Sequence, residues 1–578
     1  MKIKLILALL VITQFSYGQN IFTKSIAKLA KMTGKGNDVL SANLEEVSPV
    51  LVIVSSNLTP KELGTISQTF FNGWISGGDA VFFAFTKKNE AKYVKIDGTV
   101  MVDGQPAEYI TSGMYAAFSS PNSAARKVEI TTSTGQKSSF MIEPSKKHLK
   151  VLSVNGQTDK IELDLSKDVE VQLDDAELPD NSLLKVSLAI NQMSIKSIYD
   201  VCYIRKGSKI IIPAAAFRNI NIKPAGKAIY GYKKSFLTVG VESEAKATSL
   251  SGPFGIVDYK NTYEDGKFVS ISKEPELNLG LTAKAKEELK DGEMNYDFFK
   301  PGAFTSRSIQ QLKKIGLYNF TIEGQTLSEA SVITQEENKA KNESQTTKLT
   351  TVTFPPQTNE VWNEVLAKIY PQICAVIQSE LKATILPPDA VVQTTSYKSL
   401  SRLAKENTNS NKEFISGFGG SKTLSSILPL TEGLGSNSTL EKIMNEVGVD
   451  ALLNLTLSFS AQRDGDFGVL TPKLTFELIG KANNLAAGTT YYSGTITGKG
   501  VPSEHIGLKV EYFSANGLDN TGRNDAKVYH TAGTINAEEL EKIVRRADFV
   551  TVLAKALKDI KSKELANTDY ETAWNLQK

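Results

Sequence analysis

The strongest constraint on the fold of this chain is the alternation of apolar and polar residues, which is repeated over neighbouring segments. Between residues 453 and 459 every second residue is large and apolar: Leu453, Leu455, Leu457 and Phe459. After a turn, a second alternation follows at Leu474, Phe476 and Leu478, and a third strand is expected from Thr489 to Thr497. A period of two is typical of strands with one buried face. The sequence therefore predicts an antiparallel meander.

A helix is predicted directly before this meander. Ser438 and Glu441 have the spacing of a capping box, in which each side chain pairs with a backbone amide of the first turn. Gly448 suits the left-handed conformation that ends many helices. The apolar residues between them share one helical face: Leu440, Ile443, Met444 and Val447. We expect Leu455 to face the core beneath the helix that carries Ile443, and Thr456 to point outward.

The first 18 residues have the composition of an export signal. Two lysines precede a mostly apolar run from Leu5 to Phe15, and Ser16 and Gly18 supply small residues at a cleavage site. This order is typical of a secretory signal peptide. We expect an exported protein, periplasmic, associated with the outer membrane or extracellular. No later segment is long and apolar enough to predict a transmembrane helix.

The net charge bears on the binding partners of this chain, and the cysteine count bears on its disulfides. The net charge is +3, and two of the positive charges belong to the signal. A nearly neutral chain is not attracted to nucleic acid by its net field, so no nucleic-acid partner is predicted. Two cysteines, Cys202 and Cys374, are too few for a disulfide framework and are interpreted as buried apolar residues, with a bridge between them left open.

Because 578 residues exceed what one hydrophobic core supports, we expect a multidomain α+β protein. Its N-terminal half should hold β-sandwich modules of the Ig type, and its C-terminus an α/β module with the antiparallel meander. The expected order is a signal (1–18), an α/β segment (19–90), a β-sandwich (91–157), a second β-rich domain (158–275), a mixed segment (276–333), a linker (334–358), a C-terminal α/β domain (359–562) and a tail (563–578).

Several local expectations accompany this division. The linker is predicted because only Ala340 and Leu349 are apolar between residues 334 and 350. Pro371 should kink or split a helix that starts near Asn359. The remaining expectations are helices at 284–290 and 306–315, strands at 317–322 and from Val391, a long mobile loop at 405–436, and one last helix from Asn536 to about residue 560.

The C-terminal part carries a resemblance to a known module. The residues concerned are the helix Thr439–Val447, the corner Gly448-Val449-Asp450-Ala451 and the strand residues Tyr491-Tyr492-Ser493-Gly494. With these features, residues 359–500 and 536–560 resemble the periplasmic α/β domain of envelope proteins such as the curli pore lipoprotein and the TolB amino-terminal domain. The resemblance implies protein–protein assembly at the envelope without catalysis. No lipid-bearing cysteine follows the signal, which departs from the pore family.

The sequence nominates no catalytic, cofactor-binding or metal-binding residue. His148, His505 and His530 have no metal-ligand spacing and are interpreted as surface or loop residues. The segment Gly417–Thr423 looks like a phosphate loop but has no glycine directly before its lysine, so it is interpreted as an ordinary loop. The turn Asp464-Gly465-Asp466 offers too few oxygens for calcium.

Three functions remain open. The first is an exported, non-enzymatic envelope protein that acts as a scaffold or assembly component within an envelope or outer-membrane complex, with its oligomeric state unknown. The second is a glycan- or surface-ligand-binding protein. Trp74, Tyr109 and Tyr115 could then stack on the ligand, although core packing is the preferred interpretation of each. The third is a secreted hydrolase whose triad meets only in space.

Overall fold

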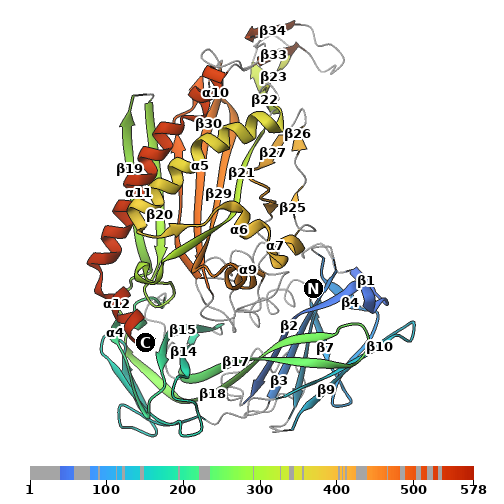
Figure 1. Cartoon of the computed structure of the whole chain (residues 1–578), viewed down its shortest axis with the longest axis vertical. Coiled ribbons are helices and arrows are strands. Elements are labelled where there is room, and N and C mark those ends of the chain that lie inside the picture. The colour runs from blue at the N-terminus through green and yellow to red at the C-terminus, as the bar shows by residue number, and fades with distance from the viewer. Residues whose placement is uncertain are drawn as a thin grey trace.

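The computed structural model describes residues 39–56, 79–88, 92–111, 113–119, 124–143, 149–192, 195–220, 235–290, 292–325, 327–336, 344–353, 357–400, 404–405, 408–409, 413–424, 439–464, 467–481, 489–502, 509–516, 525–530 and 537–578. The predicted export signal and Trp74 lie outside these residues. Most of the described residues form strands, and the chain is α+β with two lobes, the N-terminal one below the C-terminal one in Figure 1.

One large sheet forms the frame of the N-terminal lobe. Thirteen strands belong to it among the described residues, in the main order β6-β5-β9-β10-β17-β18-β2-β3-β8-β7, with β12 beside β18 and with β14 joining β15 to β17. Their bounds are β2 Val47–Ser56, β3 Asp79–Lys87, β5 Gly98–Val102, β6 Gln105–Pro106, β7 Glu108–Thr111, β8 Met114–Ser119, β9 Arg126–Thr132, β10 Lys137–Ile142, β12 Ile161–Asp164, β14 Leu183–Gln192, β15 Ile195–Arg205, β17 Ser235–Ser251 and β18 Ile256–Lys273.

The long β17–β18 hairpin joins two hydrophobic cores. Near residues 237–241 and 269–271 it contributes Leu237 and Val269 to one core, and near residues 245–259 it contributes Ala247 and Tyr259 to the other. Separate Ig-like sandwiches at 91–157 and 158–275 are therefore not confirmed. A hairpin of 17- and 18-residue strands, both from the segment 158–275, contributes to both cores. A local alternation cannot reveal how far a strand continues into a second core.

Shorter elements complete this lobe. A three-stranded sheet of β11 (Lys150–Val154), β13 (Val169–Asp174) and β16 (Lys209–Ile212) covers the second core. A parallel pair, β1 (Val39–Ser41) and β4 (Val94–Ile96), flanks the first. The short helices are η1 (Leu44–Glu46) and α4 (Ala214–Phe217).

The predicted meander forms the centre of the C-terminal lobe. β29 (Ala451–Asp464), β30 (Phe467–Gly480) and β31 (Thr489–Gly498) pair antiparallel, as expected. They belong to a ten-stranded sheet in the main order β19-β20-β31-β30-β29-β21-β27-β26, where β24 (Thr384–Ile385) pairs with β21 and β32 (Val501–Pro502) with β30.

The mixed segment 276–333 supplies much of this sheet. β19 (Gly280–Leu289), β20 (Gly292–Pro301) and β21 (Lys314–Gln325) come from it, so the boundary predicted at residue 359 is about 80 residues too late. The helix predicted at 284–290 is wrong. Although these residues favour helices, residues 280–289 form a strand that pairs with β20 and buries Ala283. The helix predicted at 306–315 is only the 3₁₀ turn η3 (Ile309–Gln311), whereas the strand predicted at 317–322 is confirmed.

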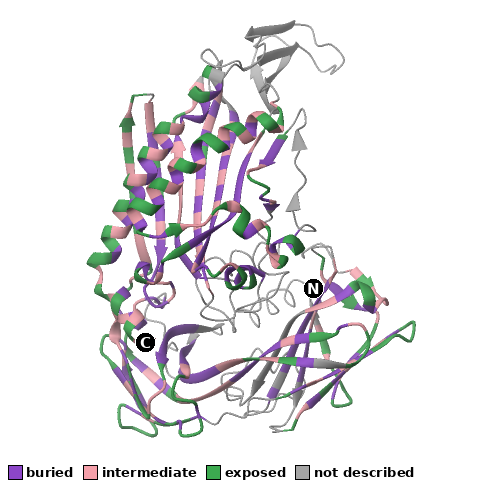
Figure 2. Ribbon diagram, in the orientation of Figure 1, coloured by how far each residue is buried: buried purple, intermediate pink, exposed green. Residues whose placement is uncertain are grey.

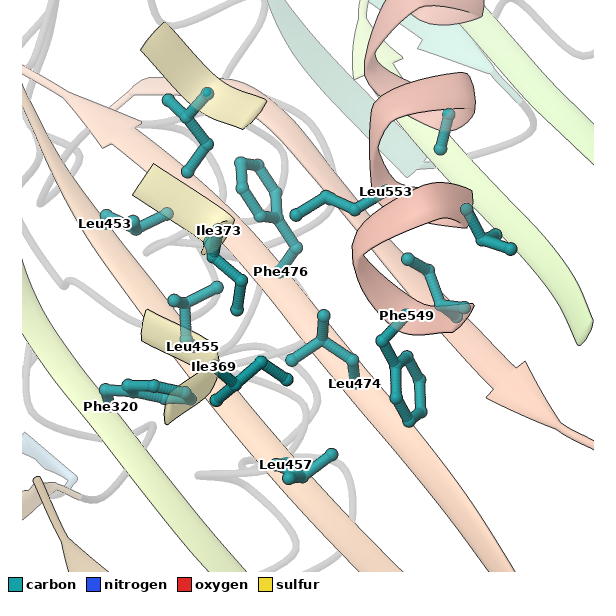
Figure 3. Close-up of a cluster of buried hydrophobic side chains, with 14 of the residues drawn as sticks. Phe320, Ile369, Ile373, Leu453, Leu455, Leu457, Leu474, Phe476, Phe549 and Leu553 are labelled. Carbon is teal, nitrogen blue, oxygen red and sulfur yellow. The ribbon is translucent and has the colours of Figure 1, made fainter. Parts of the chain in front are cut away.

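Two long helices, α5 (Asn359–Leu381) and α11 (Arg546–Ala566), cover one face of this sheet (Figure 1). Leu455 is fully buried there, and Figure 3 shows it close to Ile369 and Ile373 of α5. The predicted register of β29 is confirmed. The predicted covering helix is wrong, because Ile443 of α9 (Thr439–Val447) packs in a separate cluster with Leu452, on the opposite face.

Figure 2 shows the resulting burial pattern, with buried residues along the strands beneath α5 and α11. Pro371 does not split α5, which runs unbroken through it. The proline lies on the exposed side, where water can hydrate the carbonyl of Ala367 that it leaves without an amide partner. The strand predicted from Val391 is instead the helix α6 (Pro388–Val392), which starts with a proline in its first turn, and α7 (Thr395–Lys398) follows it.

Part of the predicted mobile loop at 405–436 is strand. β27 (Glu413–Gly417) pairs with β21, and short strands flank it: β25 (Ala404–Lys405), β26 (Thr408–Asn409) and β28 (Thr423–Leu424). The pairing with a central strand overrides the loop-like composition of this segment. Residues 425–438, with Ser438 of the predicted capping box, lie outside the described residues.

The predicted linker is also wrong in part. β22 (Leu327–Glu336) and β23 (Ser344–Thr353) pair with each other, and β33 (Lys509–Asn516) and β34 (Asp525–His530) complete a four-stranded sheet. Threonine, the commonest residue of β23, is β-branched and favours strands without being apolar. Low hydrophobicity therefore misled the linker prediction.

The C-terminus differs from prediction in two ways. The last helix is divided into α10 (Ala537–Val544) and α11 at Arg545, whose φ is +49°. The predicted tail 563–578 is the end of α11 followed by α12 (Thr568–Asn575), which packs into the core of the N-terminal lobe. The sequence expectation missed α12 because only two of its residues, Tyr570 and Ala573, are buried.

Candidate functional site

The structure does not describe the side chains of the three histidines, so it does not test whether they are catalytic. His148 and His505 lie outside the described residues, and for His530 the structure gives only a backbone position at the end of β34. Among the described residues, no three His, Cys, Asp or Glu side chains are grouped as metal ligands. Cys202 and Cys374 are free, and burial raises the pKa of the Cys202 thiol to about 12.

The glycine-rich segment 417–423 is a turn held by its own polar groups. Gly419 and Gly420 have positive φ, and the Ser421 hydroxyl donates to the backbone oxygen of Phe320 at 3.1 Å. The Lys422 ammonium donates to the carbonyl of Lys398 at 2.8 Å. Since that ammonium is directed to backbone carbonyls, the geometry fits a structural turn better than a phosphate site.

The two described tyrosines considered for stacking lie against each other. The ring centroids of Tyr109 and Tyr115 are 5.1 Å apart, edge to face. Tyr115 is only 5% exposed, and its hydroxyl accepts the amide of Ile96 at 2.8 Å. A buried ring with a bonded hydroxyl stabilises the core and offers no free face to a sugar.

A cluster of buried charges, which the sequence did not nominate, lies on the central sheet of the N-terminal lobe. Lys185 on β14 contacts the Asp200 carboxylate at 3.1 Å and the Glu242 carboxylate at 3.3 Å. Lys260 on β18 lies 3.9 Å from the second oxygen of Glu242. Glu264 belongs to the same group, since its charge and that of Lys185 influence each other. We call these five residues the charge cluster.

Alternation places the charge cluster on one face of the sheet. Its members occupy the polar positions of strands whose other positions, such as Val186 and Val241, fill the core. Charged residues at the polar positions of otherwise apolar strands could have indicated from the sequence that charges are buried here. Strand pairing, however, decides which of them meet, and pairing is not readable from one sequence.

Burial and charge oppose each other in this cluster. Burial lowers the pKa of Lys185, and the carboxylates of Asp200 and Glu242 raise it, so that the ammonium form is strongly favoured. Burial raises the pKa of Glu264. Tyr203 is 6% exposed, and burial together with Glu242 raises the pKa of its phenol. Two ammonium groups thus face three carboxylates, an arrangement that stabilises protonation of Glu264.

The face that bears the charge cluster also meets the C-terminal lobe. Asp258, farther along β18, forms an ion pair at 3.7 Å with Lys442 of α9. The C-terminal lobe therefore contacts this face of the sheet two residues along β18 from Lys260. The pairing of the five residues accounts for the buried charges as a structural network, in which the Ser187 hydroxyl also donates to the Asp200 carboxylate at 3.2 Å.

A second polar group lies on the C-terminal sheet, on the face opposite α5 and α11. Asn319 on β21 donates from its side-chain amide to the Asn454 oxygen at 2.9 Å. Asn454 in turn donates to the Glu477 carboxylate at 3.3 Å. Burial raises the pKa of Glu477. This line of hydrogen bonds crosses β21, β29 and β30 and fixes their relative register.

The four-stranded sheet is the candidate interaction surface. β22, β23, β33 and β34, which we call the arm, stand at the end of the C-terminal lobe away from the N-terminal lobe (Figure 1). Among the described strands, the outer ones, β22 and β34, each pair on one side only. A strand edge can accept another chain's strand through its backbone groups.

Comparison with known proteins gives no family. No protein-family model and no curated protein matches the chain. Among solved structures, a mutant of Salmonella alpha-2-macroglobulin is similar at 9% identity with a TM-score of 0.12. That alignment covers 87% of this chain and only 47% of the other, so this chain spans less than half of it. Such a likeness carries no argument about fold or function.

Length and apolar character decide whether a helix of the described part of the chain could cross a lipid bilayer. No helix there combines the length and the apolar character that crossing a bilayer requires.

Proposed function

We propose that this chain is an exported, non-enzymatic component of a cell-envelope protein complex, and that the arm is its partner-binding element. The observation that supports this most is the position of the arm. A four-stranded sheet follows the central strand β21 and extends beyond the main sheet. Among the strands that the structure describes, its two outer ones each pair on one side.

The backbone geometry indicates the mode of binding. An edge strand presents a row of amide and carbonyl groups, so a partner strand can extend the sheet by main-chain hydrogen bonds. β34 is short, six residues, and lies last in the order β22-β23-β33-β34. A partner strand beside β34 would continue the sheet without rearranging the lobes.

Two sequence features support the location and the class. The first 18 residues have the order of a signal peptide. The C-terminal module resembles the periplasmic α/β domain of envelope assembly proteins. Both are compatible with a periplasmic, outer-membrane-associated or extracellular protein that works through protein–protein contacts.

The glycan-binding alternative loses its best described residues, because Tyr115 is buried and Tyr109 packs on it. The hydrolase alternative depends on histidines whose side chains the structure does not describe. Neither has a specific observation in its favour.

Site-specific photo-crosslinking in intact cells tests the proposal. A photoreactive residue replaces Lys527 on β34, and a matched one replaces Lys160, an exposed lysine of the N-terminal lobe. We expect a discrete crosslinked envelope protein from position 527 and none from position 160. Equal, diffuse crosslinking from both positions, or none from 527 in an exported protein, would contradict the role of the arm.

A further inference from the structure

The C-terminal helix α12 is covalently part of one lobe and packed in the core of the other. It follows α11, whose Phe549 and Leu553 are buried in the C-terminal lobe. Yet Tyr570 and Ala573 of α12 belong to the core of the N-terminal lobe, each 3% exposed. These twelve terminal residues, 567–578, therefore connect the two lobes.

Polar contacts fix α12 in its position. The Tyr570 hydroxyl donates to the carbonyl of Pro301 at 2.8 Å. The Arg205 amide, at the end of β15, donates to the carbonyl of Leu576 at 2.8 Å, and its guanidinium donates to the carbonyl of Lys578 at 3.0 Å. Arg218 lies 3.4 Å from the Asp569 carboxylate. The three contacts with Arg205 and Arg218 tie this short helix to the N-terminal lobe, and the Tyr570 hydroxyl ties it to the end of β20.

A buried ion pair lies beneath the start of α12. Lys300 of β20 is fully buried, 3.3 Å from the Glu564 carboxylate at the end of α11. Its ammonium also donates to the carbonyl of Arg307 at 2.6 Å and lies 4.9 Å from the centre of the Tyr570 ring. Burial lowers the pKa of Lys300, so the ammonium depends on Glu564 and on the rings around it.

The helix cannot be stable without this packing. α12 has eight residues, fewer than an isolated helix needs in water, so it is helical only while docked. Segments with few buried residues open at lower free energy than the cores that they join, and α12 buries only Tyr570 and Ala573. The segment 301–304, with Ala303 and Phe304 in the same core, holds the lobes together independently of α12.

We propose that α12 is a releasable clasp. It opens as a unit before either lobe unfolds, and its opening leaves residues 301–304 as a hinge about which the lobes reorient. This proposal concerns the joint between the lobes and does not depend on what the arm binds.

Hydrogen–deuterium exchange of the full chain tests the clasp. Tyr570→Ala removes the ring and the hydroxyl, whereas Tyr570→Phe keeps the ring and removes only the bond to Pro301. We expect exchange in residues 568–578 and at Arg205 to rise about tenfold or more in Tyr570→Ala, and less in Tyr570→Phe. Exchange in β29 and β30 should stay at the wild-type rate.

Small-angle scattering of the same proteins provides the second readout. A larger radius of gyration in Tyr570→Ala than in Tyr570→Phe supports reorientation of the lobes. Unchanged exchange of α12, a rise that β29 and β30 share equally, or an unchanged radius of gyration despite released α12 would each overturn the proposal.

Discussion

At the scale of the residue, the two faces of β29 show how burial separates neighbouring positions. Leu455 is fully buried among the side chains of α5 and α11, whereas Thr456 faces the other side, 3.4 Å from the Thr321 hydroxyl. The same strand therefore contains a position that holds the core together and one that barely contributes to it.

Leu455→Ala should lower the free energy of unfolding by about 2–5 kcal/mol, because it leaves a cavity between the sheet and both helices. Thr456→Ala should lower it by about 0.5 kcal/mol or less, as substitutions away from the core usually do. Urea denaturation of the two variants measures the difference. Equal losses would contradict the register of β29.

The charge cluster makes a prediction about pH. Because the pKa of Glu264 is raised by burial, folding favours its protonated form. This favourable contribution is complete below the ordinary carboxyl pKa and is lost as pH rises from there through the raised value. Glu264→Gln keeps the shape without the charge, so it should be more stable than wild type at pH 8, by about 1 kcal/mol, with the advantage vanishing towards pH 4.

Thermal melting from pH 4 to pH 8 measures this difference. Glu288→Gln is the matched control, since the Glu288 side chain is 76% exposed on β19. A gain from Glu264→Gln that does not depend on pH, or a gain of the same size from the control, would contradict the effect of the buried carboxyl.

At the scale of the element, alternation predicted strands well and predicted their connections poorly. The meander, the helix Thr439–Val447 and the stop at Gly448, whose φ is +72°, follow from local patterns. Which helix covers which face does not, because α5 and α9 both have apolar faces and only the three-dimensional packing assigns them to opposite sides.

Polar composition misled the element predictions in the arm and in β19. Both segments are rich in polar or helix-forming residues, and both become strands because a neighbouring strand pairs with their backbone. The charge cluster was missed for the same reason. Its five residues come from four strands spread between residues 183 and 273, and their meeting depends on pairings that leave no local signature.

Pro371 offers a test at this scale. α5 continues through the proline, so the helix lacks one backbone hydrogen bond without breaking. Pro371→Ala should therefore stabilise the protein by about 1–2 kcal/mol. The alanine gains helix propensity, and the greater flexibility of the unfolded chain offsets part of that gain. Thermal melting measures it. A loss of stability would show that the proline is needed for the path of α5.

At the scale of the whole molecule, two lobes with separate cores are joined by α12, by residues 301–304 and by the ion pair between Asp258 and Lys442. The arm stands at the far end of one lobe (Figure 1). This arrangement places the proposed partner-binding element away from the buried charges, so binding and internal stability should respond to different substitutions.

The arm is proposed to bind a partner, and the three histidines are proposed to have no role in chemistry. Replacing residues 509–530 by a glycine–serine linker removes β33 and β34, and with them the edge proposed to bind, and keeps the residues of both lobes in place. A second variant replaces His148, His505 and His530 by glutamine. The measurement is recovery of the crosslinked envelope partner from cells, together with rescue of the deletion phenotype. We predict that the shortened arm loses both and the triple histidine variant keeps both. A folded triple variant that keeps its partner but loses rescue, or a shortened arm that keeps both, would contradict the account.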